Sequence, residues 1–99
     1  MKYEDRLEDH LERFLPEDLE RIHAARTWAA VLHEGELRAS GEPEVTHLER
    51  TAAILAGMGM DADSVIAGLL HHAMEECKTT RPNVDERFGP RVAELVDEL

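Results

Sequence analysis

The sequence predicts an all-α fold, a single small domain built as a bundle of about five helices. Apolar residues recur at spacings of three and four, and glycine or proline separates the periodic segments. No stretch alternates between apolar and polar residues as a half-buried strand does. A chain of 99 residues, of which 42% are hydrophobic, is long enough for one domain with one core.

Three helices are expected in the first part of the chain. Residues 2–14 form a modest amphipathic helix, and a second helix runs from a proline–acid start to about residue 33. Residues 34–43 (EGELRASGEP) contain two glycines, a serine and a proline, which predicts a loop. A third helix follows that proline over about residues 44–58.

The fourth expected helix, about 62–77, is apolar on nearly every side, which is typical of a buried, central helix. A loop over residues 78–83 (KTTRPN) follows it. A short helical turn is expected over 84–88, up to a glycine, and a last helix begins at Pro90. We find no internal repeat.

The charge excludes several classes of partner. Eleven Lys and Arg against 22 Asp and Glu give a net charge of −11 and a pI near 4.8. This argues against nucleic acid and anionic membranes as partners, since both attract basic surfaces. The single cysteine, Cys77, has no internal disulfide partner, and neither a signal peptide nor an apolar run of membrane-spanning length is recognisable. We therefore expect a cytoplasmic protein.

Histidines on the most apolar helix are the main candidates for chemistry. His71 and His72 need a partner or a role there, and the i,i+4 spacing places His71 beside Glu75 and His72 beside Glu76. His47 is the natural third nitrogen if its helix packs antiparallel to theirs. Such a group can bind a divalent metal or hold one imidazole in one tautomer. The alternative is a set of partly exposed helix-end histidines paired to nearby acids.

Three segments resemble the N-terminal HD domain of RelA/SpoT-type enzymes: HEGELRASGEPEVTH, LERTAAILAGMGMDADSVIAGLLHHAMEEC and VDERFGPRVAELVD. The family patterns are H-x-G-Q-x-R-K-S-G-E-P-Y-x-x-H-P, L-L-H-D-x-x-E-D, R-F-G and V-D-G. The match covers about residues 20–97 without gaps, and the spacing of 24 between His47 and His71 fits. We therefore expect one HD-domain-like bundle over residues 1–99, truncated relative to the family.

The resemblance implies a manganese-dependent hydrolase of the guanosine nucleotide (p)ppGpp, which removes the 3′-pyrophosphate to leave GDP or GTP. By position, His47 and His71 match two metal-binding histidines, and His72 stands where the family has a metal-binding aspartate. Further matches are implied for the attacking water and for the nucleotide. Glu75 and Glu76 match the Glu-Asp pair that positions or activates the water, and Arg38 and Ser40 match the loop that lines the nucleotide pocket.

The departures from the family pattern bear on the metal. Aspartate is replaced by His72 and by Glu76, lysine by Ala39, tyrosine by Glu44 and proline by Leu48. The family's fourth metal ligand belongs to an L-A-D-R-x-x-N segment that would lie beyond Leu99. Mn²⁺ prefers oxygen-rich sites, whereas three imidazoles suit zinc, nickel or copper, so zinc or no metal at all is the alternative to manganese.

Two functions from different classes remain open. Retained His47, His71, Glu75 and Arg38 favour a phosphohydrolase, whereas His72 and the absent fourth ligand favour a catalytically silent regulatory or dimerisation module. Because family members cover the central helix with later helices, apolar surface is expected to be exposed here, which predicts a homodimer or a longer parent chain. That surface is expected around Leu69, Leu70, Val92 and Leu95.

Overall fold

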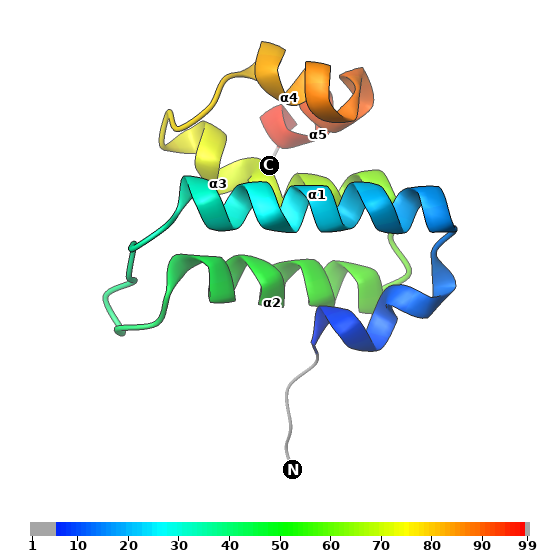
Figure 1. The fold of residues 1–99 in the computed structure, drawn as a ribbon, viewed down its shortest axis with the longest axis horizontal. Helices are drawn as coiled ribbons and strands as arrows, with labels where there is room; N and C mark the ends of the chain where they lie inside the picture. Colours follow the sequence, from blue (N-terminus) through cyan, green and yellow to red (C-terminus); the bar gives the residue numbers. More distant parts are fainter. Residues whose placement is uncertain (1–5, 99) are drawn as a thin grey trace.

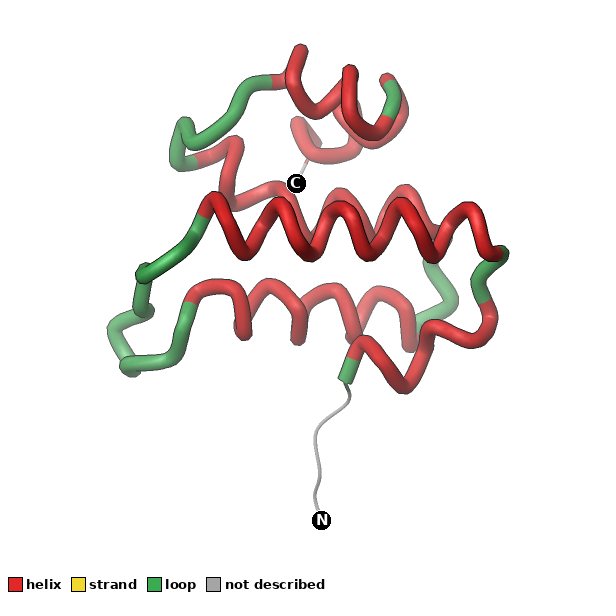
Figure 2. Tube along the Cα trace, in the orientation of Figure 1, coloured by secondary structure: helices red, strands yellow, loops and turns green. Residues whose placement is uncertain are grey.

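The computed structural model describes residues 6–98, where one 3-10 helix precedes five α-helices (Figure 1). The elements are η1 (Leu7–Arg13), α1 (Pro16–Leu32), α2 (Glu44–Gly57), α3 (Ala62–Glu75), α4 (Arg81–Phe88) and α5 (Pro90–Glu98). The all-α prediction is confirmed. Within the described residues extended pairing is limited to one isolated bridge between Leu37 and Pro43, in the long loop after α1 (Figure 2).

Helix α3 lies at the centre of the bundle, in contact with α1, α2 and α5. The chain reverses direction between α1 and α2 and again between α2 and α3 (Figure 1). The C-terminal end of α1, the N-terminal end of α2 and the C-terminal end of α3 therefore lie at the same end of the bundle. Helices α4 and α5 pack on each other, and α5 covers α3.

The composition of α3 explains its central place. Asp61 begins the helix by accepting a hydrogen bond from the backbone N–H of Ser64, which satisfies one of the free donors of the first turn. Gly68 permits close packing against α2, because a Cβ at this position would lie 2.6 Å from Leu55 Cδ1. Four large side chains of α3 have no exposed surface: Val65, Ile66, Leu69 and Leu70.

The expected apolar surface around Leu69, Leu70, Val92 and Leu95 is not found. Leu69, Leu70 and Val92 are fully buried, and Leu95 packs partly buried against the core. The prediction was wrong because it required later helices of the family to cover the central helix, whereas α5 packs directly on α3. Among residues 6–98, the exposed large hydrophobic side chains lie elsewhere, at Leu15, Val31, Leu37, Ile54, Met58 and Met60.

The first helix and α4 differ from their predicted boundaries. The first helix is a 3-10 helix over residues 7–13 instead of a helix over 2–14, and Tyr3 lies outside the described residues. Helix α4 begins at Arg81, within the predicted loop, because the Thr80 hydroxyl accepts a hydrogen bond from the backbone N–H of Asn83. Leu99 is likewise not described.

Helix α3 ends at Glu75, two residues before the predicted end. Glu76 is the C-cap, and Cys77 takes a left-handed conformation with φ 62°, which a continuous helix does not contain. None of the described helices has the length and apolar character that a membrane-spanning helix needs.

Candidate metal centre

The three candidate metal-binding histidines lie side by side at the shared end of α2 and α3. His47 comes from the first turns of α2, and His71 and His72 come from the last turns of α3. The ring centroids of His47 and His72 are 5.6 Å apart, and those of His71 and His72 are 4.3 Å apart at 79°. Two imidazoles on one tetrahedral zinc, with Zn–N bonds of about 2.0–2.1 Å, have centroids roughly 5 Å apart. The rings are therefore neighbours on the scale of a shared ion.

Hydrogen bonds fix the tautomer of two of these rings. His71 Nδ1 lies 3.1 Å from the carbonyl oxygen of Gly68, and His72 Nδ1 lies 2.8 Å from Glu44 Oε2. Both partners are acceptors, so Nδ1 carries the proton and donates in each ring. Among residues 6–98, no hydrogen bond reaches Nε2 of either ring. The Nε2 lone pairs are thus available to a metal ion, which is the usual arrangement of metal-binding histidines.

A different group has its ligand atoms closer together. Within residues 6–98, the group whose ligand atoms all lie within 4.8 Å of one another consists of His33, Glu36 and Glu76, and the three imidazoles do not all meet that spacing. The His33 side chain is fully buried, and its Nδ1 is 2.9 Å from Glu36 Oε1. The Lys78 ammonium pairs with Glu36. A cation bound here would have to displace Lys78, so this cluster is already neutralised by the chain itself.

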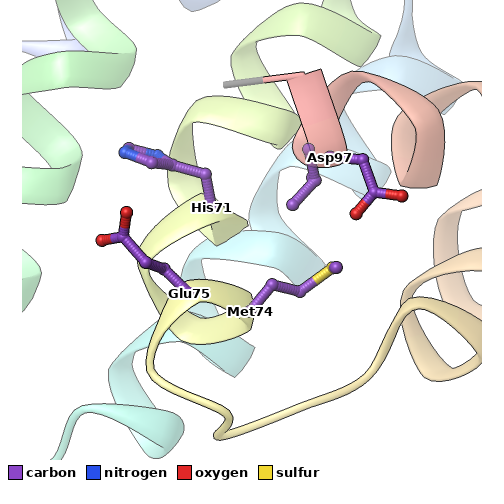
Figure 3. Close-up of a pocket in the computed structure, with 5 residues that line it drawn as sticks. His71, Met74, Glu75 and Asp97 are labelled. Carbon is purple, nitrogen blue, oxygen red and sulfur yellow. The ribbon is translucent and has the colours of Figure 1, made fainter.

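Glu75 lies with His71 at a pocket of about 220 Å³ (Figure 3). Both side chains extend from α3 toward the same side, whereas the Asp97 carboxylate points away from them. Asp97 forms an ion pair with Arg81 at the rim. The pocket is lined by His71, Met74, Glu75, Val96 and Asp97. A carboxylate beside an imidazole at an open pocket can orient a water molecule and accept its proton.

Glu76 does not join His72 as the i,i+4 spacing suggested. Its Oε1 lies 4.0 Å from His33 Nδ1, and the carboxylate that binds His72 is Glu44. Glu76 keeps its helical position, since its backbone N–H donates to the His72 carbonyl oxygen, so the difference lies in its side chain, whose carboxylate extends toward His33. The structure therefore places the two adjacent glutamates in different clusters.

The loop between α1 and α2 brings one of its two candidate residues to the histidines. Arg38 Nη1 lies 3.4 Å from Glu44 Oε1, so its guanidinium reaches the carboxylate that also binds His72. Ser40 is exposed at the loop, where its hydroxyl accepts a hydrogen bond from the backbone N–H of Glu42. Arg38 is thus part of the histidine cluster, whereas Ser40 serves the turn.

Sequence reasoning missed the partner of His72. It recorded Glu44 only as a departure from the family pattern, although Glu44 and His47 are three residues apart on α2 and therefore share a face. A buried imidazole needs a hydrogen-bond partner, and an acid on the facing helix was the signal that could have found it. The cluster of His33, Glu36 and Glu76 was missed as well, because Glu76 comes from the end of α3, whereas His33 and Glu36 follow α1.

Burial sets the protonation of two of the histidines. Burial lowers the pKa of His71, and burial together with the Arg38 guanidinium lowers the pKa of His47. Both effects disfavour the imidazolium. Both rings therefore remain neutral to a lower pH than an ordinary histidine, and neutral imidazole is the form that binds metal.

The lowered pKa of His71 predicts a pH dependence of stability. The unfolded chain binds the proton at a higher pH than the folded chain, so the free energy of unfolding decreases as pH falls from about 6.5 through the lowered folded value. Replacing His71 with glutamine is expected to reduce the loss of stability between pH 7.5 and pH 5. Urea unfolding at both pH values measures it, with His23→Gln, at an exposed position, as the control. An equal loss in both variants would contradict the assignment.

The matches to known proteins cover most of the chain. A model of the HD domain family matches residues 25–99. The guanosine-3′,5′-bis(diphosphate) 3′-pyrophosphohydrolase of Vibrio cholerae is 40% identical over 94 residues, covering 94% of this chain and 13% of that protein. The bifunctional (p)ppGpp synthase/hydrolase SpoT of Escherichia coli is 41% identical over 88 residues, covering 88% of this chain and 12% of that protein. The guanosine-3′,5′-bis(diphosphate) 3′-pyrophosphohydrolase of Aquifex aeolicus is 42% identical over 94 residues, covering 92% of this chain and 14% of that protein.

The chain thus spans about an eighth of the length of these relatives. The matched region contains all of α2, α3, α4 and α5, and with them the three histidines of the candidate metal centre. The resemblance noted in the sequence is confirmed: the chain belongs to the HD domain family and is a RelA/SpoT-type HD domain.

Proposed function

We propose that this chain is a metal-dependent phosphohydrolase of the HD type, acting on guanosine nucleotides that carry a 3′-pyrophosphate, such as (p)ppGpp. The observation that supports it is the end of the bundle where His47, His71 and His72 are neighbours. Two of these rings keep Nε2 free of hydrogen bonds within the described residues. Relatives that are named as 3′-pyrophosphohydrolases match the same region.

The residues fit a divalent metal by their donor chemistry. His47, His71 and His72 would bind it through neutral imidazole nitrogen. Nitrogen donors favour zinc, nickel or copper over manganese, so zinc is the metal we propose. When bound, such a cation supplies Lewis acidity toward a phosphate oxygen and toward water.

Glu75 is the base in the proposed reaction. It takes a proton from water, and the water oxygen forms a bond to the phosphorus that is linked to the 3′-oxygen. The bond from that phosphorus to the 3′-oxygen breaks, the 3′-oxygen takes up a proton, and GDP or GTP and pyrophosphate leave. Glu75 is preferred to Glu76 because Glu75 lines the pocket beside His71, whereas Glu76 lies near His33. Glu76, which lies near His33 and Glu36, would orient the water.

Arg38 and Ser40 would bind the nucleotide in this proposal. The chain carries a net charge of −11, which repels a polyphosphate, so a local cation at the site has to offset that field. The Arg38 guanidinium is half-exposed and already lies at the histidine cluster, where a phosphate can share it with Glu44. The Ser40 hydroxyl is exposed on the same loop and can donate to a phosphate oxygen.

A catalytically silent regulatory or dimerisation module is the second candidate. Two observations favour it. Glu44 already pairs with both Arg38 and His72. The nitrogens of the three imidazoles do not all lie within 4.8 Å of one another. In that function the histidines would act as a packing motif at the end of the bundle, without a metal.

Pyrophosphate release from ppGpp distinguishes the two functions. The purified chain is freed of metal and assayed with added Zn²⁺, Co²⁺ or Mn²⁺. We expect release that depends on metal and is faster with Zn²⁺ or Co²⁺ than with Mn²⁺, because the donors are nitrogen. Glu75→Gln should slow the rate by about 100-fold or more, since it removes the base. No release with any metal from a fully helical protein would leave the silent module.

A further inference from the structure

The carboxylate of Glu44 is buried between charged and polar groups of three segments. Glu44 is the first residue of α2, and 8% of its surface is exposed. One oxygen, Oε2, accepts the Nδ1 proton of His72 from α3. The other, Oε1, lies 3.4 Å from the Arg38 guanidinium of the preceding loop. Burying a carboxylate is unfavourable unless its oxygens are bonded, and here both oxygens have a partner.

The hydrogen bond from His72 decides which nitrogen of that ring faces outward. A neutral histidine has one protonated and one unprotonated nitrogen, and a carboxylate on Nδ1 holds the proton there. Nε2 of His72 then keeps its lone pair. His71 has the same tautomer through the Gly68 carbonyl, which belongs to its own helix. His72 differs, because its tautomer depends on a side chain from another helix.

Glu44 also supplies the charge that the imidazoles lack. Three neutral imidazoles bring no negative charge to a cation, and Arg38 brings a positive one. The Glu44 carboxylate bonds to His72, and His47 lies on the same face of α2, three residues further along the helix. A carboxylate behind a metal-binding histidine orients the ring and raises the basicity of the other nitrogen.

On the basis of the proposed function, we infer that Glu44 is the positioning carboxylate of the metal centre. It holds His72 as an Nε2 donor, and it supplies the negative charge that a cation on three imidazoles requires. It also keeps the Arg38 guanidinium from facing that cation without a counter-charge. Compared with the family pattern, a histidine replaces the aspartate at position 72, and the acid that pairs with this histidine is at position 44.

Two variants separate the hydrogen bond from the charge. Glu44→Gln keeps an oxygen that accepts the His72 proton and removes the charge. Glu44→Ala removes both. Glu42→Gln is the matched control, because Glu42 lies two residues before Glu44 but pairs with Arg50. Circular dichroism of each variant establishes that the helices are retained.

Calorimetric titration of the metal-free chain with Zn²⁺ is the first measurement. We expect Glu44→Gln to weaken zinc binding about 10-fold and Glu44→Ala up to about 100-fold, as for other carboxylates behind a metal-binding histidine. Glu42→Gln should bind as the unmodified chain does. Equal zinc affinity in the unmodified chain and Glu44→Ala would overturn the inference while leaving the proposed function intact.

The second measurement needs no metal. Side-chain ¹⁵N spectra of the metal-free chain at pH 8 report which nitrogen of His72 is protonated. We expect Nδ1 to carry the proton in the unmodified chain and in Glu44→Gln, and a mixture of tautomers in Glu44→Ala. An unchanged tautomer in Glu44→Ala would overturn the positioning role. If the unmodified chain binds no zinc, the proposed function fails, and the spectra still decide whether Glu44 sets the His72 ring.

Discussion

Zinc affinity is expected to fall by about 100-fold or more in His71→Ala, because this change removes a direct nitrogen donor, whereas loss of an outer carboxylate costs 10–100-fold. His71 is the ring whose tautomer is set within its own helix, by the Gly68 carbonyl, so its Nε2 is held ready without help from another element. Alanine is favourable in a helix and leaves α3 intact. Calorimetric titration with Zn²⁺ measures the affinity, and pyrophosphate release from ppGpp should disappear with it.

His23→Ala is the matched control for this loss. His23 is exposed on α1, away from the end of the bundle that holds the candidate metal centre, so its removal should leave zinc binding unchanged. If His71→Ala binds zinc as tightly as the unmodified chain, the metal is held elsewhere. In that case Glu36→Gln would weaken binding, because Glu36 belongs to the cluster with His33 and Glu76.

Leu70→Ala is expected to lower the free energy of unfolding by about 2–5 kcal/mol, the range for large-to-small changes in a core. Leu70 has no exposed surface and lies on the helix that α1, α2 and α5 all contact. A cavity at this position has packed neighbours on every side and relaxes poorly. The loss is measured by urea unfolding followed by circular dichroism.

Leu37→Ala removes the same atoms from a side chain that is 66% exposed, so its effect should stay within about 0.5 kcal/mol. The two variants remove the same atoms and differ only in the burial of the side chain that is shortened. Similar losses in both would show that α3 is not the centre of the core. The comparison also tests the burial of Leu70, which the sequence placed at an exposed surface.

Local patterns were sufficient to predict most of the fold. The proline before Glu17 and the loop over residues 34–43 locate α1 and the start of α2 to within one residue. The apolar character of residues 62–75 correctly identified α3 as the buried helix. These features depend on residues that are close in the sequence, so they can be predicted from it.

Features that depend on capping were predicted less well. Thr80 starts α4 through a single hydrogen bond to the Asn83 N–H, within a segment whose composition is typical of a loop. The left-handed Cys77 ends α3 early, although a cysteine seldom takes this conformation. In both places one residue's hydrogen bond or dihedral angle outweighs the composition of the segment.

Contacts between distant segments could be predicted only in part. Antiparallel packing of α2 on α3 was enough to expect His47 beside His71 and His72. It was not enough to find that Glu44, rather than Glu76, binds His72, since that depends on which way the Glu76 side chain turns and on a contact between α2 and α3. The burial of Leu69 and Val92 depends on the path of α5 across α3. The spacing of apolar residues in the sequence does not predict that path.

X-ray absorption spectroscopy at the zinc edge of the zinc-loaded chain tests most directly whether His47, His71 and His72 hold one metal ion. We predict a first shell dominated by nitrogen at about 2.0–2.1 Å, with the outer scattering of three imidazole rings. A first shell of carboxylate oxygens with one imidazole, which His33, Glu36 and Glu76 would provide, would contradict the account.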